Sequence, residues 1–306
     1  MNFNALLIKI GIFAILLVLG NIMARKKVIS EWFAKDTSKL MLNVFIVASI
    51  INSVLGERPA ITTAEMWKAV LVLTANYVII YGTGFIASRF FRNESNVAQT
   101  ETIIGVINSL FVGLPVVGAL CGGEATFYIG LSCLPYNIIL YTYSTARLRS
   151  GNGGKGGFSI KEVMTPTLIA ALISMVIFLV NRPMPKFFTE LVGSVAGATT
   201  PLSMLLIGAT LGNVNFKELL KDKRIYIISA IRLIIVPLLA YFVLKPFVTN
   251  EVLLLCCVVL AGCPTGMIVT PLSIEYGYDP RYSSRMIAST TILSFITLPI
   301  LIYILF

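Results

Sequence analysis

The chain is organised around the stretch Ile107-Asn108-Ser109-Leu110-Phe111-Val112-Gly113-Leu114-Pro115 and a second one, Val259-Leu260-Ala261-Gly262-Cys263-Pro264-Thr265-Gly266-Met267. Each stretch lies near the middle of an apolar run that is long enough to cross a bilayer, and each carries a Gly-x-Pro. Proline removes a backbone donor and clashes with the preceding turn, and glycine adds chain freedom, so a continuous helix avoids both residues. Two interruptions at matching places predict a shared purpose.

The composition places the chain among membrane proteins. Of its 306 residues, 57% are hydrophobic and only 12% are charged, and it contains no histidine. A soluble domain of this length could not bury so much apolar surface, so we expect an all-α polytopic membrane protein. The five cysteines fall in or beside apolar runs and have no histidine to complete a metal site. We interpret them as small core residues and expect neither a metal nor a cofactor.

Hydropathy predicts ten membrane spans. They cover roughly residues 3–23, 37–55, 66–88, 99–120, 125–146, 162–181, 188–212, 225–244, 252–275 and 283–305. The first run contains Lys9 in place of a basic leader before it, and it lacks a small-x-small cleavage site. We therefore expect this run to be a permanent helix and not a cleaved signal.

Lysine and arginine are distributed unevenly between the loops. The odd-numbered loops and their flanks hold seventeen of these residues, whereas the even-numbered loops hold five, Arg58, Lys68, Arg182, Lys186 and Lys245. By the positive-inside rule, the odd loops are cytoplasmic and both termini face outward. The net charge of +10 is therefore a topology signal, and we expect no nucleic-acid partner.

The longest polar connection divides the chain into two sets of five spans. Residues 151–160 are rich in glycine and include Lys155, which predicts a flexible cytoplasmic linker. A phosphate-binding glycine loop is the alternative, but the flanking strand and the Gly-Lys-Ser/Thr ending are absent. The linker separates residues 1–150 from residues 161–306. Because five is odd, the second half enters the membrane upside down relative to the first, which predicts two inverted repeats.

The two Gly-x-Pro sequences occupy corresponding places in these halves. Gly113 and Gly262 are 149 residues apart, as are Pro115 and Pro264. We therefore expect spans four and nine to be broken helices that cross near the bilayer midplane, inside the protein or along a water-filled cavity, because unsatisfied backbone is costly in hydrocarbon. Two half-helix N-termini would then point at the midplane, where their partial positive charge suits an anion. The alternative is that each Gly-x-Pro only kinks its helix for packing.

Several motifs resemble the auxin efflux carrier family of transporters. The segment Asn108-Ser109-Leu110-Phe111-Val112-Gly113-Leu114-Pro115 is similar to that family's Asn-x-x-Phe-x-Gly-x-Pro motif. Residues 201–212 are similar to the family's seventh span, residues 232–237 to its eighth, residues 264–266 to its ninth-span crossover, and residues 289–294 with Pro299 to its tenth. The resemblance covers nearly the whole chain. One departure is Val47, which stands where the second span of the family usually has a proline.

The resemblance implies a fold and an activity. The fold is sodium/proton-antiporter-like, with a scaffold made of spans one, two, six and seven. Spans three to five and eight to ten form a transport domain that moves like an elevator. Bacterial members are often described as carriers of malonate, malate and related anions. We therefore expect a secondary transporter of small mono- or dicarboxylates in a bacterial cytoplasmic membrane, surrounded by lipid and able to form a homodimer through its scaffold helices.

The expected substrate site gathers residues around the crossover, namely Asn43, Asn108, Ser109, Gly113, Pro115, Arg232, Gly262, Pro264 and Thr265. The amide of Asn108 would donate to a carboxylate or cap the freed backbone, and Asn43 would face the same cavity or hydrogen-bond to another helix. Thr265 would cap the following half-helix and offer its hydroxyl to substrate. Arg232 would be the counter-charge of the anion or would reach toward the cytoplasmic interface.

Coupling and competing functions stay open in the sequence. The glutamates of the spans lie near span ends, so no central carboxylate pair of the sodium/proton-antiporter kind is visible, and both uniport and proton coupling fit. A sodium-coupled symporter of the bile-acid type is the alternative carrier, and it should show a denser cluster of acidic and amide ligands around the crossover. A membrane enzyme would need a catalytic constellation, and we expect no catalytic residue.

Overall fold

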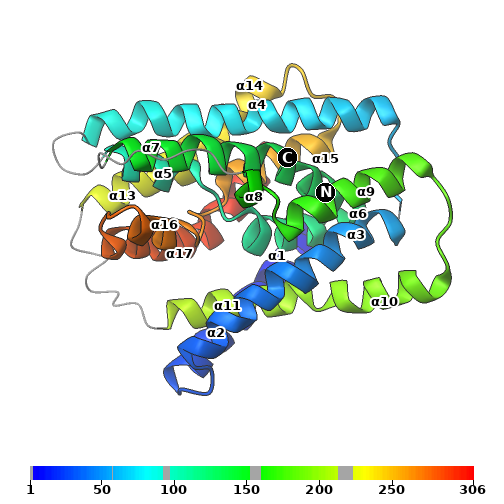
Figure 1. Ribbon diagram of the computed structural model, residues 1–306, viewed down its shortest axis with the longest axis horizontal. Coiled ribbons are helices and arrows are strands. Elements are labelled where there is room, and N and C mark those ends of the chain that lie inside the picture. Colours follow the sequence, from blue (N-terminus) through cyan, green and yellow to red (C-terminus); the bar gives the residue numbers. More distant parts are fainter. Residues whose placement is uncertain (1–2, 57, 92–96, 152–159, 213–222) are drawn as a thin grey trace.

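The computed structural model describes residues 3–56, 58–91, 97–151, 160–212 and 223–306 (Figure 1). These residues form helices joined by short connections, and the only β-type pairing among them is an isolated bridge between Ile107 and Thr265. Figure 1 shows α4 (Thr63–Ser88) along one side of the molecule and α10 (Lys186–Gly197) with α11 (Thr199–Leu211) along the opposite side.

The remaining elements follow in chain order. The first half contains α1 (Phe3–Arg25), α2 (Glu31–Leu40), η1 (Met41–Phe45), α3 (Ile46–Leu55), η2 (Arg89–Phe91), α5 (Val97–Gly105), η3 (Ser109–Gly113), α6 (Leu114–Ile139), η4 (Leu140–Ser144) and α7 (Thr145–Gly151). The second half contains α8 (Ile160–Val163), α9 (Pro166–Val180), α13 (Lys223–Ala230), η5 (Ile231–Ile235), α14 (Val236–Leu244), α15 (Glu251–Gly262), α16 (Val269–Glu275) and α17 (Pro280–Leu305). The predicted linker at 151–160 falls, apart from its two end residues, outside the described residues.

Seven helical runs in the described residues are long and apolar enough to cross a membrane. They are Ile8–Arg25, Trp32–Leu55, Thr63–Phe91, Ser109–Gly151, Lys186–Leu211, Lys223–Leu244 and Pro280–Leu305. Two shorter apolar helices, Pro166–Val180 and Glu251–Gly262, accompany them. The chain is therefore a multi-pass membrane protein, as its composition predicts. The finer expectation of ten spans in two inverted repeats stays a prediction.

The longest of the seven runs consists of two helices joined at a kink. Gly122, between Ser109 and Gly151, has a φ of 68° and a ψ of −143°, which residues with a Cβ rarely adopt. The kink at Gly122 lies within residues 121–124, where the hydropathy places the connection between the fourth and fifth spans. The backbone conformation alone favours glycine at this position. A Cβ there would meet no atom within 4 Å, so a steric clash is not the reason.

Polar caps begin several of the helices that surround the interrupted segments. Thr62 and Glu65 form a capping box at the start of α4, in which each side chain accepts a hydrogen bond from the other residue's N–H. Thr165 caps α9, with Pro166 in its first turn, and Asn250 caps α15. The start of each of these helices is therefore set by local sequence.

Helices α1 and α11 pack closely against each other. A Cβ on Gly20 would lie 2.1 Å from the carbonyl oxygen of Leu205, and a Cβ on Gly208 would lie 2.0 Å from that of Leu17. Gly20 and Gly208 therefore allow the two backbones to approach closely. In α10, by contrast, an added Cβ on Gly197 would meet nothing within 4 Å, so no close contact requires glycine there.

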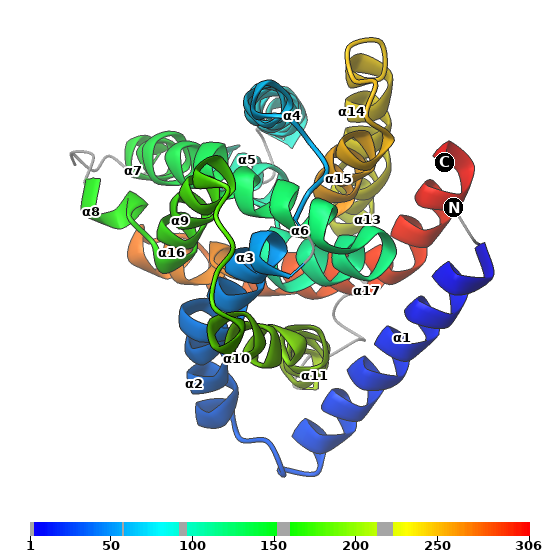
Figure 2. The same cartoon turned by 90° about the vertical axis from the view of Figure 1, so that its right-hand side faces the viewer.

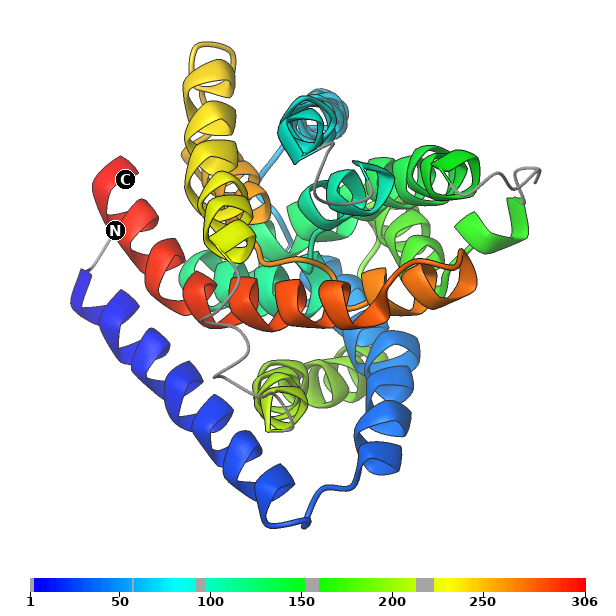
Figure 3. The same cartoon turned by 90° about the vertical axis from the view of Figure 1, so that its left-hand side faces the viewer.

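Helix α17 runs through the middle of the molecule. Figures 2 and 3 both show it between α13–α15 on one side and α10–α11 on the other. It contacts both ends of the interrupted segments, since it packs on α5, α15 and α16. The beginning of α1 and the end of α17 lie near each other in both views.

Candidate functional site

The two stretches singled out in the sequence lie against each other in the structure. Helix α5 ends at Gly105, and the chain becomes helical again at Ser109. Helix α15 ends at Gly262, and α16 begins at Val269. The non-helical residues between these ends are paired antiparallel, through the bridge of Ile107 with Thr265. Segments more than 150 residues apart in sequence are therefore brought together at one point.

Backbone hydrogen bonds hold this contact. The N–H of Asn108 donates to the carbonyl oxygen of Pro264 at 2.8 Å, and the N–H of Gly266 donates to that of Val106 at 2.9 Å. A Cβ on Gly266 would lie 2.9 Å from the carbonyl oxygen of Ile107, so the close approach requires glycine. The backbone freed by the helix ends is thereby satisfied inside the protein, as burial in a membrane demands.

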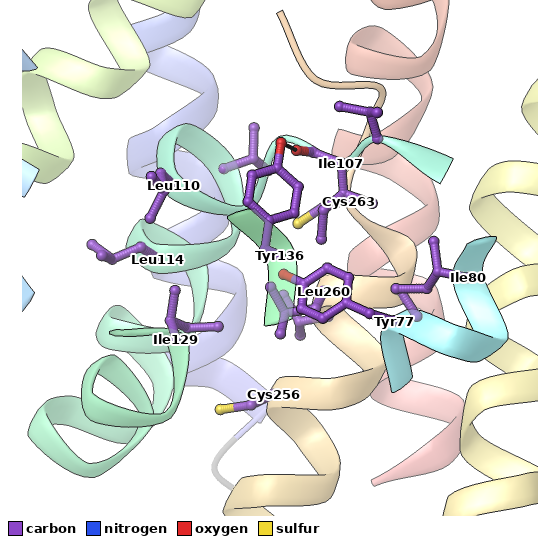
Figure 4. Close-up of a cluster of buried hydrophobic side chains, with 14 of the residues drawn as sticks. Tyr77, Ile80, Ile107, Leu110, Leu114, Ile129, Tyr136, Cys256, Leu260 and Cys263 are labelled. Atoms are coloured by element: carbon purple, nitrogen blue, oxygen red, sulfur yellow. Dashed lines mark hydrogen bonds between the residues drawn. The ribbon is translucent and has the colours of Figure 1, made fainter. Parts of the chain in front are cut away.

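Side chains satisfy further carbonyl groups of the same contact. The hydroxyl of Thr265 donates to the carbonyl oxygen of Ile103 at 3.0 Å, and the hydroxyl of Tyr136 donates to that of Ile107 at 3.1 Å. Figure 4 shows Tyr136 reaching this carbonyl, with Cys263 beside its ring. The donors that bond to these carbonyl groups at the end of α5 are therefore uncharged.

The first interruption is not where the sequence places it. The Gly-x-Pro predicts a break at Gly113–Pro115, but the non-helical residues are 106–108, and Pro115 lies in the first turn of α6. Proline is tolerated there because η3, a π-helical turn at Ser109–Gly113, precedes it and its missing N–H falls near a helix start. The second interruption does coincide with its motif, since α15 ends at Gly262 and Cys263 is extended.

A cavity of about 410 Å³ opens beside the paired segments. It is lined by residues of α2 and η1, of the first segment, of α6 and η4, of the start of α9, and by residues 266–268 and Pro271. The described residues that line it are all uncharged, and its polar members are Ser38, Asn43, Asn108, Ser109, Tyr136, Asn137, Tyr141, Thr165 and Thr167. Such a lining of hydroxyl and amide groups among apolar walls is typical of a small-molecule site.

Asn108 is a buried amide with an unused donor. Its side chain is 4% exposed and lines the cavity, and its Nδ2 has no hydrogen-bond partner among the described residues. Although Asn108 stands directly before the helix that begins at Ser109, its side chain makes no capping hydrogen bond. Of the two roles expected from the sequence, backbone capping is therefore not observed, and the Nδ2 group is free to donate to a ligand.

Ser109 and Asn43 also line the cavity. Ser109 is the first residue of the helix that follows the interruption. Asn43 is exposed, and its amide donates to the carbonyl oxygen of Lys39 at 2.7 Å, one turn earlier in the same run of helix. The interhelical bond considered for Asn43 is therefore replaced by a bond within its own helix, and its side chain faces the same cavity as Asn108.

The other expected residues of the crossover do not line the cavity. Gly113 packs against Cys263, with an added Cβ only 3.1 Å from the sulfur, and Gly262 packs against Leu298. The carbonyl oxygen of Pro264 accepts the backbone N–H of Asn108, and the hydroxyl of Thr265 donates to the carbonyl oxygen of Ile103 in α5. In this structure these residues pack within the paired segments and do not line the cavity. Their direct contact with substrate stays a prediction, as does that of Pro115.

Arg232 lies fully buried in η5 and does not line the cavity. Its Nη1 donates to the carbonyl oxygen of Ala261 at 2.5 Å, in the last turn of α15. Its Nε and Nη2 have no hydrogen-bond partner among the described residues. The structure therefore shows neither the reach to the membrane surface nor the contact with the cavity that the sequence left open.

Tyr136, Asn137 and Thr165 line the cavity and were not selected from the sequence. The amide of Asn137 donates to the carbonyl oxygen of Cys133 at 2.8 Å, and its Oδ1 accepts the hydroxyl of Thr165 at 3.2 Å. The signal that could have found Asn137 is the one that selected Asn108, an amide within a predicted membrane span. Tyr136 carries no such signal, because tyrosine is common in membrane helices.

A buried ion pair anchors α5 away from the cavity. Glu101 is 1% exposed and accepts hydrogen bonds from Arg147 Nη2 at 2.8 Å and Nε at 3.1 Å. The hydroxyl of Tyr143 also bonds to its carboxylate. The sequence left end-of-span glutamates open as proton carriers, and this one is held in a charge-paired network.

Comparison with known proteins agrees with this architecture. Residues 155–302 match the family model described as membrane transport protein. Across 296 residues, which cover 94% of each chain, the sequence is 27% identical to an "uncharacterized transporter" of Methanothermobacter thermautotrophicus. The chain is a membrane transporter, and its similarities agree with the resemblance to the auxin efflux carrier family.

The family match runs through the second interrupted segment of this transporter, and the similarity to the archaeal protein spans both. The paired segments and the cavity beside them are thus features of a membrane transport protein. The resemblance found in the motifs around Asn108 and Pro264 agrees with both comparisons.

Proposed function

We propose that this transporter carries small organic anions, mono- or dicarboxylates, and that it holds the carboxylate in the cavity beside the paired segments. The observation that carries the proposal is the Nδ2 group of Asn108, a buried donor that lines this cavity without a partner among the described residues. A buried polar group without a partner costs free energy, so a ligand that accepts its hydrogen bond is favoured.

The electrostatics of the cavity favour an anion over a cation. Two helices begin at its wall, one at Ser109 and one at Pro166, and both residues belong to the cavity or its immediate border. The first N–H groups of a helix lack intrahelical partners and carry a partial positive charge. Since the described lining residues include no carboxylate, nothing in them compensates a cationic substrate. The volume, about 410 Å³, suits a ligand of a few carbons with its water.

We further propose the topology implied by the family, in which ten spans form two inverted five-span repeats and the broken fourth and ninth spans cross near the bilayer midplane. The antiparallel pairing of Ile107 with Thr265 supports this, because corresponding segments of inverted repeats meet in opposite directions. Residues 1–150 and 161–306 are the proposed repeats, with the linker between them.

An elevator movement needs a scaffold and a transport domain. The proposed scaffold comprises the first, second, sixth and seventh spans, and the backbone contact of α1 with α11 joins the first and seventh of these. The pairing of the two interrupted segments joins the fourth and ninth spans in the proposed transport domain. A homodimer through the scaffold helices stays part of the proposal.

The charge distribution supports an inward-open cavity. Ser38 and Thr165 line the cavity and each follows a basic loop that the positive-inside rule places in the cytoplasm. The proposal therefore puts both termini outside the cytoplasmic membrane and opens the cavity, in the conformation described, toward the cytoplasm.

Uptake into proteoliposomes tests the proposed function. Purified transporter would be supplied with radiolabelled mono- and dicarboxylates while sodium, pH and voltage are imposed separately. We expect saturable uptake of at least one carboxylate. Transport of only a cation or a neutral solute would contradict the proposal, and a strict requirement for sodium would favour a bile-acid-type symporter.

The variant Asn108→Ala tests the site itself. Loss of one hydrogen bond to a charged carboxylate should raise the KM by roughly 10- to 100-fold with little change in thermal stability. Asn21→Ala is the matched control, because Asn21 is an amide in α1 that bonds to Gly208 and does not line the cavity. An unchanged KM in well-folded Asn108→Ala would assign Asn108 a structural role.

A further inference from the structure

The carbonyl end of α15 carries a charged cap. A half-helix that ends inside a membrane protein leaves carbonyl groups without intrahelical partners and carries a partial negative charge. In α15, the carbonyl oxygen of Leu260 accepts the N–H of Cys263 at 3.2 Å, and that of Ala261 accepts the guanidinium of Arg232 at 2.5 Å. One of the two bonds is therefore made by a cation.

Arg232 is built into this position by its own helix. It is 0% exposed, and it lies in η5, a π-helical turn of Ile231–Ile235 that packs directly on α15 and α17. A π-helical turn of this kind is frequently found at functional sites. An arginine in a membrane span usually lowers the free-energy cost of its charge by extending to the membrane interface. Arg232 is fully buried and does not extend there.

The surroundings of Arg232 leave its charge uncompensated. The titratable groups that interact electrostatically with it are the thiol of Cys263 and the hydroxyls of Tyr81, Tyr77 and Tyr136, all of which are ordinarily neutral near pH 7. No ion pair to Arg232 occurs within the described ranges, and two of its three nitrogen groups are unpartnered there. A buried charge of this kind is expensive, so it is retained where it does something that a neutral residue cannot do.

Tyr136 and Cys263 connect this charge to the proposed substrate site. Tyr136 interacts electrostatically with Arg232, lines the cavity and bonds to Ile107, so this side chain links the guanidinium to the wall of the cavity. In a low-dielectric interior a full charge acts over such a separation. Arg232 thus adds positive potential at the cavity without touching what is bound there.

Carriers with interrupted helices use the carbonyl ends of half-helices to coordinate a coupling cation. Here the corresponding end is occupied by a side chain. We infer that Arg232 is the resident cation of this transporter, neutralising the carbonyl end of α15 in place of a coupled metal ion, so that transport proceeds without sodium. Sodium-free transport rests on the proposed function, whereas the capping of α15 rests on the geometry of Arg232 alone.

Stability measurements on purified protein test the inference without a substrate. The melting temperature of the wild type should be the same in sodium chloride, lithium chloride and choline chloride at equal ionic strength. Arg232→Ala should melt roughly 3–6 °C lower, and millimolar guanidinium should restore part of this loss whereas equal choline should not. Arg224→Ala is the matched control, because Arg224 lies two turns earlier, in α13, and its loss should not be rescued.

The variant Arg232→Lys covers the case in which Arg232→Ala does not fold. It keeps the charge and loses the fork of donors, so it should fold and should transport, without sodium, whichever panel carboxylate the wild type takes up. A wild type that is stabilised by sodium or requires it for uptake would overturn the inference, as would a folded Arg232→Ala without guanidinium rescue. Sodium-independent stability with guanidinium rescue, but with no carboxylate uptake, would overturn only the proposed function.

Discussion

The two interrupted segments solve the same problem with different chemistry. At the end of α5, freed carbonyl groups accept hydrogen bonds from Thr265, Tyr136 and the backbone of Gly266, all of which are uncharged donors. At the end of α15, the carbonyl of Ala261 accepts a guanidinium. The difference teaches that the pairing of the segments is symmetric in its backbone but not in its charge.

Charge also anchors the two half-helices differently. Helix α5 carries a buried carboxylate, Glu101, whose partner Arg147 neutralises it. Helix α15 carries no charge within its buried part, and receives one from Arg232. One half-helix is therefore held by a closed ion pair, and the other by a single cation that is open to a further partner.

Removing the partner of Glu101 should produce the largest effect. Arg147→Met leaves a carboxylate that is 1% exposed without its charge partner, which should lower the free energy of unfolding by roughly 3 kcal/mol. Arg149→Met is the control, because Arg149 donates a hydrogen bond to the neutral hydroxyl of Tyr276. Denaturant unfolding in detergent measures both. Equal losses in the two variants would show that charge does not anchor α5.

Adding a methyl group at the contact should come next. The Cβ of Gly266→Ala would lie 2.9 Å from the carbonyl oxygen of Ile107, a backbone atom that cannot turn away, and should cost about 2 kcal/mol. In Gly113→Ala the Cβ would meet the sulfur of Cys263 at 3.1 Å, and a side chain can shift. Thermal unfolding should therefore separate the two variants. If Gly113→Ala lost as much thermal stability as Gly266→Ala, the contact at Gly266 would not be the tighter of the two.

Removing a neutral cap should cost less. Thr265→Val keeps the shape of the side chain but leaves the carbonyl of Ile103 unpaired, which should lower stability by about 1–2 kcal/mol. Asn108→Ala removes a donor that has no partner among the described residues, so its stability should stay near that of the wild type while its transport falls. If Asn108→Ala were the less stable of the two, the division between structural and substrate-facing residues would be reversed.

The two prolines should show the smallest difference. Pro264 follows an extended residue, Cys263, and prevents α15 from continuing, so Pro264→Ala should lower stability by up to about 1 kcal/mol. Pro115 lies in the first turn of α6, where alanine is well tolerated, so Pro115→Ala should be neutral within about 0.5 kcal/mol. A larger loss for Pro115→Ala would restore Gly113–Pro115 as the site of the first break.

The sequence predicts the second break better than the first for a physical reason. Pro264 and the residue before it restrict the local backbone, so the end of α15 can be read from neighbouring residues. Nothing in Val106, Ile107 or Asn108 forbids a helix. Their non-helical conformation is set by hydrogen bonds to Pro264 and Gly266, and no local pattern can reveal such long-range partners.

The same division applies to the cavity. Asn43, Asn108 and Ser109 could be predicted because polar groups in apolar spans are costly unless they are used. Tyr136 and Thr165 escape this reasoning, since a tyrosine and a helix cap are common in membrane proteins for other reasons. The position of Arg232 required knowing that η5 packs on the end of α15, which is a fact of tertiary structure.

The hydrogen bonds between the two segments can form only after both segments have been synthesised. The backbone N–H of Asn108 donates to the carbonyl oxygen of Pro264, which is synthesised 156 residues later. At ordinary rates of translation this is a delay of roughly 8–30 s, during which the first segment is present without its native partner. In that interval its amides must be hydrated or shielded by the insertion machinery. The rate of translation therefore sets the earliest time at which the two segments of a new molecule can pair.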